Sequence, residues 1–125
     1  MADDKRKTLL VDFDGVIHSY ESGWQGAAVI ADLPIHGAFE WLERASEHFD
    51  ISIFSARNGQ HGGTVAMVMW FMRHGLKDSV LRRLDFPMVK PKAFLTIDDR
   101  SIRFEGDWSK IDPSTLLKFK TWQES

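Results

Sequence analysis

A pair of acids one residue apart, Asp12 and Asp14, is the pattern in this sequence with the clearest chemical meaning. It directly follows the apolar run Thr8-Leu-Leu-Val11, which is typical of a buried strand. Because side chains two residues apart in a strand share a face, we expect the two carboxylates to converge just past the strand's end. Adjacent carboxylates repel each other and destabilise a fold unless a cation or a proton lies between them. The pair therefore predicts a cation site, although Asp-x-Asp-Gly is also the composition of an ordinary strand-ending turn.

Polar clusters also follow two other strand-like runs. The run 50–54 leads into Ser55-Ala56-Arg57, and the run 93–97 leads into Asp98-Asp99-Arg100. In parallel sheets the carboxyl ends of the strands lie at one edge, where ligands bind. If these strands are parallel, the three clusters meet at a single rim.

Helical periodicity fills the stretches between the strands. After Pro34, apolar residues recur at helical spacing; they are Ala38, Trp41, Leu42, Ala45 and Phe49. A second helix is expected to have Thr64 as its N-cap, an apolar body over 65–72 and Gly75 at its end. A helix that is apolar on every side is buried or lies at an interface.

The second half of the chain gives weaker signals. Pro87 limits the stretch 84–89 to an edge strand, and 102–108 is expected to add a last strand. Asp112-Pro113 is typical of a helix start. The closing helix is expected to bury Leu116, Leu117, and Phe119 or Trp122.

The alternation of strands and helices predicts one α/β domain over residues 1–125, with a mostly parallel central sheet and helices on both faces. Residues 1–7 are expected to form a charged tail. The turn-rich stretch 18–33 is either a flap over the strand ends or an ordinary surface loop.

Composition bounds the class of protein. The chain is 43% hydrophobic, which suffices for a core, and its formal net charge of −2 gives no general attraction to nucleic acid or to an anionic membrane. There are no cysteines, which suits a reducing compartment. The first residues show no apolar signal segment, and the longest apolar run is too short to span a bilayer. We expect a cytoplasmic protein without a membrane partner.

The predicted rim has the chemistry of a magnesium and phosphate site. Its four carboxylates come from Asp12, Asp14, Asp98 and Asp99, and Mg²⁺ prefers such oxygen ligands. Lys90 and Lys92 precede the last two acids. A metal and a lysine together would neutralise a phosphoryl group, whose transfer depends mostly on positioning and charge.

The order of these motifs resembles the haloacid dehalogenase (HAD) superfamily of phosphohydrolases. The resemblance is carried by Asp12-Phe-Asp14-Gly-Val, Phe54-Ser55-Ala-Arg57, Lys90-Pro-Lys92 and Ile97-Asp98-Asp99-Arg100. It covers residues 8–100 and is strongest to small, nearly capless members in bacteria and phages. It implies a Rossmann-like fold with a minimal cap or none, and an open site.

The resemblance implies a role for each motif. Asp12 would be the nucleophile that forms an aspartyl-phosphate, and Asp14 the general acid and base. Ser55 and the backbone N–H groups after it, beginning with Ala56, would hold the phosphoryl oxygens. Lys90 would stabilise the phosphoryl charge, with Lys92 as its rival. Magnesium would be held by Asp12, the Asp14 carbonyl, Asp98 and Asp99.

Three further residues, Arg57, Arg100 and His18, each have two alternative roles. Arg57 and Arg100 are candidates for contact with a substrate, although an arginine after a strand is more often an ion-pair partner. The substrate class stays open among a nucleotide, a nucleic-acid end and a small phosphometabolite. For His18 the two alternatives are contact with a substrate and no role.

Three competing interpretations remain. The first is a non-catalytic module that binds magnesium and phosphate on the same fold. The second is a receiver domain of a signalling pair, which the order of the motifs disfavours because Lys90 precedes Asp98. The third concerns assembly: Trp70, Phe71 and the methionines from Met67 to Met88 would form a homodimer face.

Overall fold

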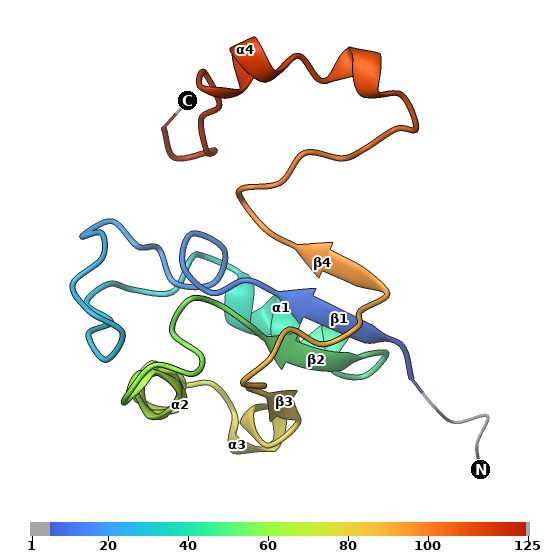
Figure 1. Ribbon diagram of the computed structural model, residues 1–125. Coiled ribbons are helices and arrows are strands. Elements are labelled where there is room, and N and C mark those ends of the chain that lie inside the picture. The colour runs from blue at the N-terminus through green and yellow to red at the C-terminus, as the bar shows by residue number, and fades with distance from the viewer. Residues whose placement is uncertain (1–5, 125) are drawn as a thin grey trace.

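A four-stranded parallel sheet organises the computed structural model, which describes residues 6–124 (Figure 1). The strand order is β3-β2-β1-β4, and every pairing is parallel. The strands are β1 (Thr8–Val11), β2 (Asp50–Ile53), β3 (Leu84–Asp85) and β4 (Leu95–Ile97). Val11 pairs with Ile53 on one side and with Ile97 on the other, so three strands end at the same level. The predicted parallel α/β sheet is confirmed.

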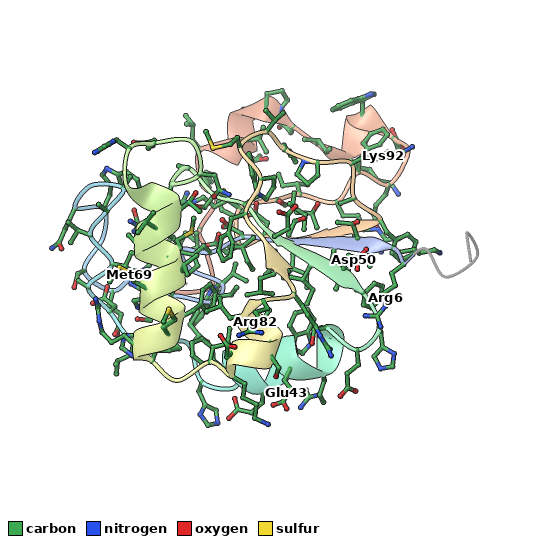
Figure 2. All side chains as sticks on the ribbon, turned by 90° about the horizontal axis from the view of Figure 1, so that it is seen from below. Arg6, Glu43, Asp50, Met69, Arg82 and Lys92 are labelled. Carbon is green, nitrogen blue, oxygen red and sulfur yellow. The ribbon has the colours of Figure 1, made fainter. Side chains whose placement is uncertain are left out.

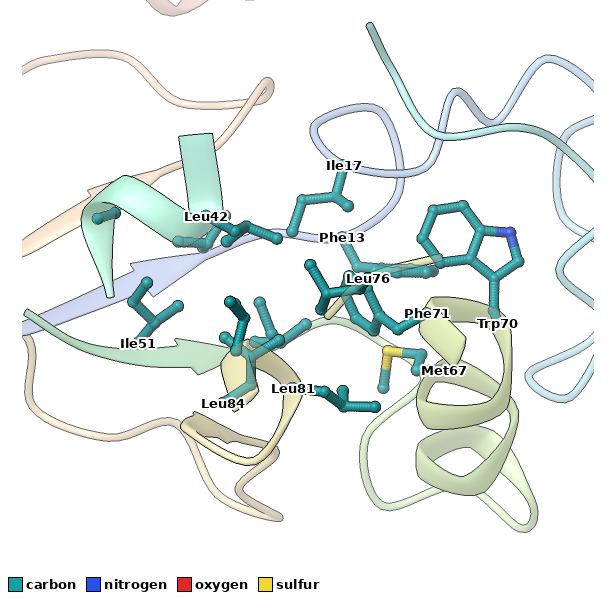
Figure 3. Close-up of a cluster of buried hydrophobic side chains, with 14 of the residues drawn as sticks. Phe13, Ile17, Leu42, Ile51, Met67, Trp70, Phe71, Leu76, Leu81 and Leu84 are labelled. Carbon is teal, nitrogen blue, oxygen red and sulfur yellow. The ribbon is translucent and has the colours of Figure 1, made fainter. Parts of the chain in front are cut away.

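The hydrophobic core lies on one face of this sheet. Leu9, Val11, Ile51 and Ile53 point to that face, because they alternate along β1 and β2 and are in register. The helices on this face are α1 (Ala38–Ala45), α2 (Gly63–Arg73) and α3 (Asp78–Leu81). Figure 3 shows their side chains meeting around Phe13, whose ring contacts Trp70 and Phe71 edge to face. Right-handed crossovers from β1 to β2 to β3 require all three helices to lie on this side.

The predicted homodimer face is wrong for its central residues. Trp70, Phe71 and Met67 have no exposed side-chain surface. They fill the core instead, which is the other outcome expected for a helix apolar on every side. Met69, Met72 and Met88 are exposed, and Met69 lies on the outside of α2 (Figure 2).

Helix α2 begins two residues before the position expected with Thr64 as its N-cap. Its N-cap is Gly62, in the left-handed region at φ 76°, and Gly63 is the first helical residue. A Cβ at Gly63 would clash with the carbonyl oxygen of Arg57. The close approach of this loop to the helix, rather than a hydroxyl cap, therefore decides where the helix starts. The helix ends at Arg73, two residues before Gly75 at φ 90°, as predicted.

The opposite face of the sheet has no helix in the described part of the chain, so the expectation of helices on both faces is wrong. The connection from β3 to β4 passes from one edge of the sheet to the other (Figure 1). It does so as an irregular segment, 86–94, without a helix of its own. Pro87 and Pro91 in this segment explain why no helix forms there.

The chain after β4 is the least packed part. The expected strand over 102–108 is absent from the described residues, and only η2 (Trp108–Lys110) and α4 (Pro113–Leu116) are regular. Asp112 caps α4 as predicted, since it accepts a hydrogen bond from the Ser114 N–H at 3.0 Å. The predicted burial of Leu116, Leu117, Phe119 and Trp122 is wrong, because Leu117 is 96% exposed and the others are also exposed. β4 is exposed along its length.

The two remaining predictions concern the start of the chain and membranes. Residues 1–5 of the predicted tail lie outside the described residues. Arg6 Nη1 donates to the Ser46 carbonyl at 2.7 Å, and Lys7 lies 4.1 Å from the centre of the Phe94 ring. No helix in residues 6–124 has the length and apolar character needed to cross a membrane.

Candidate functional site

Three carboxylates converge where β1 and β4 end. One oxygen from each of Asp12, Asp98 and Asp99 lies within 4.8 Å of the others. The Asp12 N–H donates to the Ile97 carbonyl at 2.9 Å, which continues the β1–β4 ladder by one residue. This parallel pairing brings together acids that are 86 residues apart in sequence (98 − 12). The predicted meeting of the first and last acidic motifs is thus present in the fold.

Asp12 has the most perturbed environment of the three. Burial, followed by the negative charge of Asp98, raises the pKa of Asp12 to about 8. A hydrogen bond of 2.9 Å from the Phe13 N–H to Asp12 Oδ1 opposes the rise, and Asp99 adds to it. Without a cation the cluster therefore holds a proton near neutral pH.

Asp99 lies against the turn that follows β1. Burial raises the pKa of Asp99. A Cβ on Gly15, which has φ 83°, would clash with Asp99 Oδ2. The glycine therefore serves the turn in two ways, by its backbone conformation and by leaving room for this carboxylate.

Asp14 is not part of the three-carboxylate cluster. Its carboxylate is held by the Arg57 guanidinium and the His18 ring. Arg57 Nε donates to both of its oxygens at 3.2 and 3.0 Å, and Arg57 Nη2 donates to Oδ1 at 3.1 Å. His18 Nδ1 lies 2.9 Å from the same Oδ1. His18 Nε2 accepts a hydrogen bond from the Asp32 N–H at 3.1 Å, so the ring proton belongs on Nδ1, which donates to Asp14.

Arg57 also fixes part of the stretch 18–33, for which a flap and a surface loop were the two predicted alternatives and which is called the flap below. Its side chain is completely buried, and Nη1 donates to the carbonyl oxygens of Gly26, Ala27 and Val29 at 2.9 to 3.1 Å. Its guanidinium carbon lies 4.9 Å from the centre of the Trp24 ring. Arg57 is therefore neither a substrate contact nor a surface ion-pair partner in this structure. It forms a buried ion pair with Asp14 and hydrogen bonds to the flap.

The loop after β2 is organised by a residue that the sequence reasoning missed. Asn58 Oδ1 accepts from the Ser55 N–H, and Asn58 Nδ2 donates to the carbonyls of Ile53 and Pro87, all at 2.9 Å. Ser55 Oγ in turn accepts from the Arg57 N–H at 3.0 Å. The sequence marked Ser55-Ala-Arg-Asn-Gly59 as a loop by its composition, but it did not indicate these partners of Asn58.

These elements enclose a cavity of about 380 Å³, hereafter the acidic cavity. It is lined by six of the predicted site residues, namely Asp12, Asp14, Ser55, Ala56, Asp99 and Arg100. Five further lining residues were not predicted, namely Tyr20, Trp24, Thr121, Gln123 and Glu124. The flap prediction pointed toward the first two, but no local pattern in the sequence marked the last three.

Neither predicted lysine lines the acidic cavity. Lys90 and Lys92 are both exposed. The Phe94 N–H donates to the Thr8 carbonyl at 2.9 Å, so the chain near Lys92 has reached the amino end of the sheet. Figure 2 agrees, with Lys92 on the side of the molecule where β2 begins at Asp50. Among the described residues, Arg100 is the one cationic side chain that lines the cavity.

Comparison of the chain with models of protein families, with curated proteins and with solved structures finds no match.

Proposed function

We propose that the protein is a magnesium-dependent phosphohydrolase of the type that the sequence motifs resemble, acting on phosphomonoesters. The observation that carries the proposal is the convergence of Asp12, Asp98 and Asp99 within 4.8 Å at the ends of two parallel strands. Asp12 and Asp99 line the acidic cavity, and Ser55 and Arg100 line it too. A small phosphate ester fits a cavity of about 380 Å³.

The carboxylate cluster fits a magnesium ion. Its donors are all oxygen, and the raised pKa of Asp12 reflects uncompensated negative charge as well as burial. Asp12, Asp98 and Asp99 would hold the metal, which would supply positive charge for the phosphoryl oxygens.

We assign Asp12 as the nucleophile. Its Oδ1 accepts the hydrogen bond from Phe13, so attack is assigned to Oδ2. The new Asp12–phosphorus bond forms as the bond from phosphorus to the ester oxygen breaks, and water then cleaves the aspartyl-phosphate to release phosphate. Asp14, positioned by Arg57 and His18, would give the leaving oxygen its proton and take one from the water.

The cationic role falls to Arg100 in this proposal. It lines the acidic cavity, whereas Lys90 and Lys92 do not. Ser55 and Ala56 also line the cavity and would hold the remaining phosphoryl oxygens. Arg100 thus replaces Lys90 as the group that neutralises the transferred phosphoryl charge.

The decisive experiment compares the wild type with Asp12→Asn on a panel of phosphomonoesters, each with Mg²⁺ and with EDTA. The panel contains sugar phosphates, nucleoside 3′- and 5′-monophosphates, and oligonucleotides with a terminal phosphate. We expect Mg²⁺-dependent release of phosphate that the variant loses by about 10³-fold or more. Hydrolysis that survives in Asp12→Asn would sink the mechanism.

One observation favours a second candidate, a non-catalytic module that binds magnesium and phosphate. Both oxygens of Asp14 are already engaged by Arg57, so this carboxylate has a structural partner that a general acid does not need. Mg²⁺ and phosphate binding by the wild type, with no turnover anywhere on the panel, would support this candidate over the hydrolase.

A further inference from the structure

The segment Thr121–Glu124, hereafter the strap, returns to the acidic cavity from far along the chain. Residues 101–110 are all exposed, and no residue of α4 is buried. Figure 1 shows this part of the chain arching away from the sheet after β4 and then turning back. Thr121, at the start of the strap, is only 5% exposed. The chain therefore leaves the fold and packs again at the cavity.

Two side-chain hydrogen bonds anchor the strap to the turn after β1. Trp122 Nε1 donates to the Gly15 carbonyl at 2.8 Å, and Gln123 Nε2 donates to the Ser19 carbonyl at 2.6 Å. Within the strap, the Thr121 N–H donates to Glu124 Oε1 at 2.9 Å. Gly15 follows Asp14, and a Cβ on it would clash with Asp99 Oδ2, so the Trp122 anchor lies beside the proposed reacting groups.

The strap limits the volume of the cavity. Thr121, Gln123 and Glu124 form one of its walls. On the far side lies a second hollow of about 750 Å³, which Tyr20 and Gln123 also line. The strap and the Tyr20 side chain thus separate two hollows, and withdrawal of the strap would join them.

The strap also changes the charge of the cavity. Glu124 adds a fourth acid to the lining, whose other acids are Asp12, Asp14 and Asp99. The hydrogen bonds from Thr121 hold the pKa of Glu124 below its usual range, and the positive charges of Arg100 and Lys120 lower it further. The Glu124 carboxylate therefore competes with a bound phosphate for electrostatic interaction with the positive charge of Arg100.

We propose that the strap is the substrate-selecting wall of the site, so that it admits small phosphomonoesters, excludes bulky ones and weakens phosphate binding through the Glu124 carboxylate. This inference rests on the proposed function for its substrate class. It assigns the selectivity of a site without a cap domain to four residues of the same chain.

The first test compares two substrates that share one reacting group, phenyl phosphate and phenyl phosphate with a long polyethylene glycol chain in the para position. The test variant is Trp122→Phe/Gln123→Ala, which removes both anchoring donors and keeps an aromatic ring. We expect kcat/KM for the bulky ester, relative to the small one, to rise roughly tenfold, since two ordinary hydrogen bonds no longer oppose opening. The matched control is Trp108→Phe/Gln25→Ala, the same changes at exposed positions outside the cavity, which should leave the ratio unchanged.

The second test does not depend on turnover. Inorganic phosphate is titrated into Glu124→Gln and into Glu105→Gln with Mg²⁺ present, and the Kd is measured by calorimetry. Glu105 is exposed and lies outside the cavity, so the two variants have the same net charge. We expect Kd to be roughly threefold lower for Glu124→Gln than for Glu105→Gln, the effect of one charge in a solvated cavity.

The outcomes separate this inference from the proposed function. If the wild type hydrolyses both esters and the strap variant leaves their ratio unchanged, the inference fails and the phosphatase stands. If no protein hydrolyses either ester, the hydrolase proposal fails and the phosphate titration decides the inference. Equal Kd values in the two glutamine variants, or no phosphate binding by either, then overturn it.

Discussion

Arg57 carries a charge into the interior, where an ion without partners would be strongly unfavourable. Its donors are matched by the two oxygens of Asp14 and by three flap carbonyls, so the structure compensates the charge fully. Its planar fork suits this set of acceptors, and the point charge of a lysine does not. The flap and the position of Asp14 therefore depend on the same side chain.

Replacing Arg57 by methionine should destabilise the fold by about 3–5 kcal/mol, because Asp14 is left as a partly buried carboxylate without its partner. Urea unfolding monitored by tryptophan fluorescence measures the change. Arg82→Met is the control, since Arg82 pairs with Asp78 on an exposed surface and should change stability by less than about 0.5 kcal/mol. Similar effects at the two positions would contradict the role assigned to Arg57.

The raised pKa of Asp12 predicts how stability depends on pH and metal. Burial and Asp98 raise this pKa to about 8 in the folded protein, against an ordinary value of 3.8. The folded state therefore binds more protons than the unfolded chain between these values, and the metal-free protein should lose stability as pH rises from about 4 to about 8. Mg²⁺ should restore most of the loss, because it offsets the charge that the proton had neutralised.

The melting temperature in EDTA and in Mg²⁺, measured across this pH range, checks the prediction. Asp12→Asn cannot ionise at position 12, so its melting temperature in EDTA should fall less steeply with pH. A wild-type melting temperature that rises with pH in EDTA, or equal slopes in the two proteins, would contradict it.

The sequence predicted the acid cluster because strand ends and parallel pairing are local and topological rules. Asp12 and Asp99 lie where those rules put them. The environment of Asp14 was not predictable in the same way, since it depends on the buried side chain of Arg57 and on three flap carbonyls. Tertiary contacts of that kind leave no periodic pattern in the sequence.

At the scale of elements, the turn after β1 has to satisfy a backbone conformation and a close neighbour together. Gly15 has φ 83°, and a Cβ there would clash with Asp99 Oδ2. Gly23 has a similar φ of 74°, yet nothing lies within 4 Å of the position of its missing Cβ. Substitutions at these two glycines therefore distinguish the effect of backbone strain from the effect of displacing Asp99.

Gly15→Ala and Gly23→Ala should each lose about 1–2 kcal/mol of stability from left-handed backbone strain. Only Gly15→Ala should also weaken Mg²⁺ binding, because Asp99 must move away from the cluster. Calorimetric titration of Mg²⁺ into both variants measures this difference. Equal Mg²⁺ affinities, with Gly15→Ala folded, would place Asp99 outside the metal site.

The element predictions succeeded where periodicity and turn chemistry agreed with packing. β1, β2, α1 and the Asp112 cap of α4 are present as expected. The start of α2 differs because the loop at Arg57 approaches too closely for a side chain at Gly63. The stretch 102–108 has strand-like composition but forms no described strand, since strand propensity is realised only against a packed neighbour.

At the scale of the whole molecule, the chain divides into a packed part and an open part. The sheet and its three helices surround one core, in which Phe13, Leu42 and Ile53 are fully buried. After β4, large apolar side chains such as Ile102 and Trp108 are half-exposed or more. Burial of apolar surface is the main stabilising contribution in folding, so these two parts should differ in local stability.

Amide hydrogen exchange should show this division directly. Amides of β1 and β2 should exchange only through global unfolding, roughly a thousandfold or more slower than the amides of residues 101–120. The strap should be intermediate, because the Trp122 and Gln123 side chains anchor it to the Gly15 and Ser19 carbonyls. In Trp122→Phe/Gln123→Ala the strap should exchange as fast as 101–120 while β1 and β2 stay unchanged.

Hydrogen exchange resolved by NMR or mass spectrometry checks each of these expected rates. Equal protection of 101–120 and the central strands would mean that the two parts unfold together, and an unchanged strap in the double variant would mean that its anchors lie elsewhere.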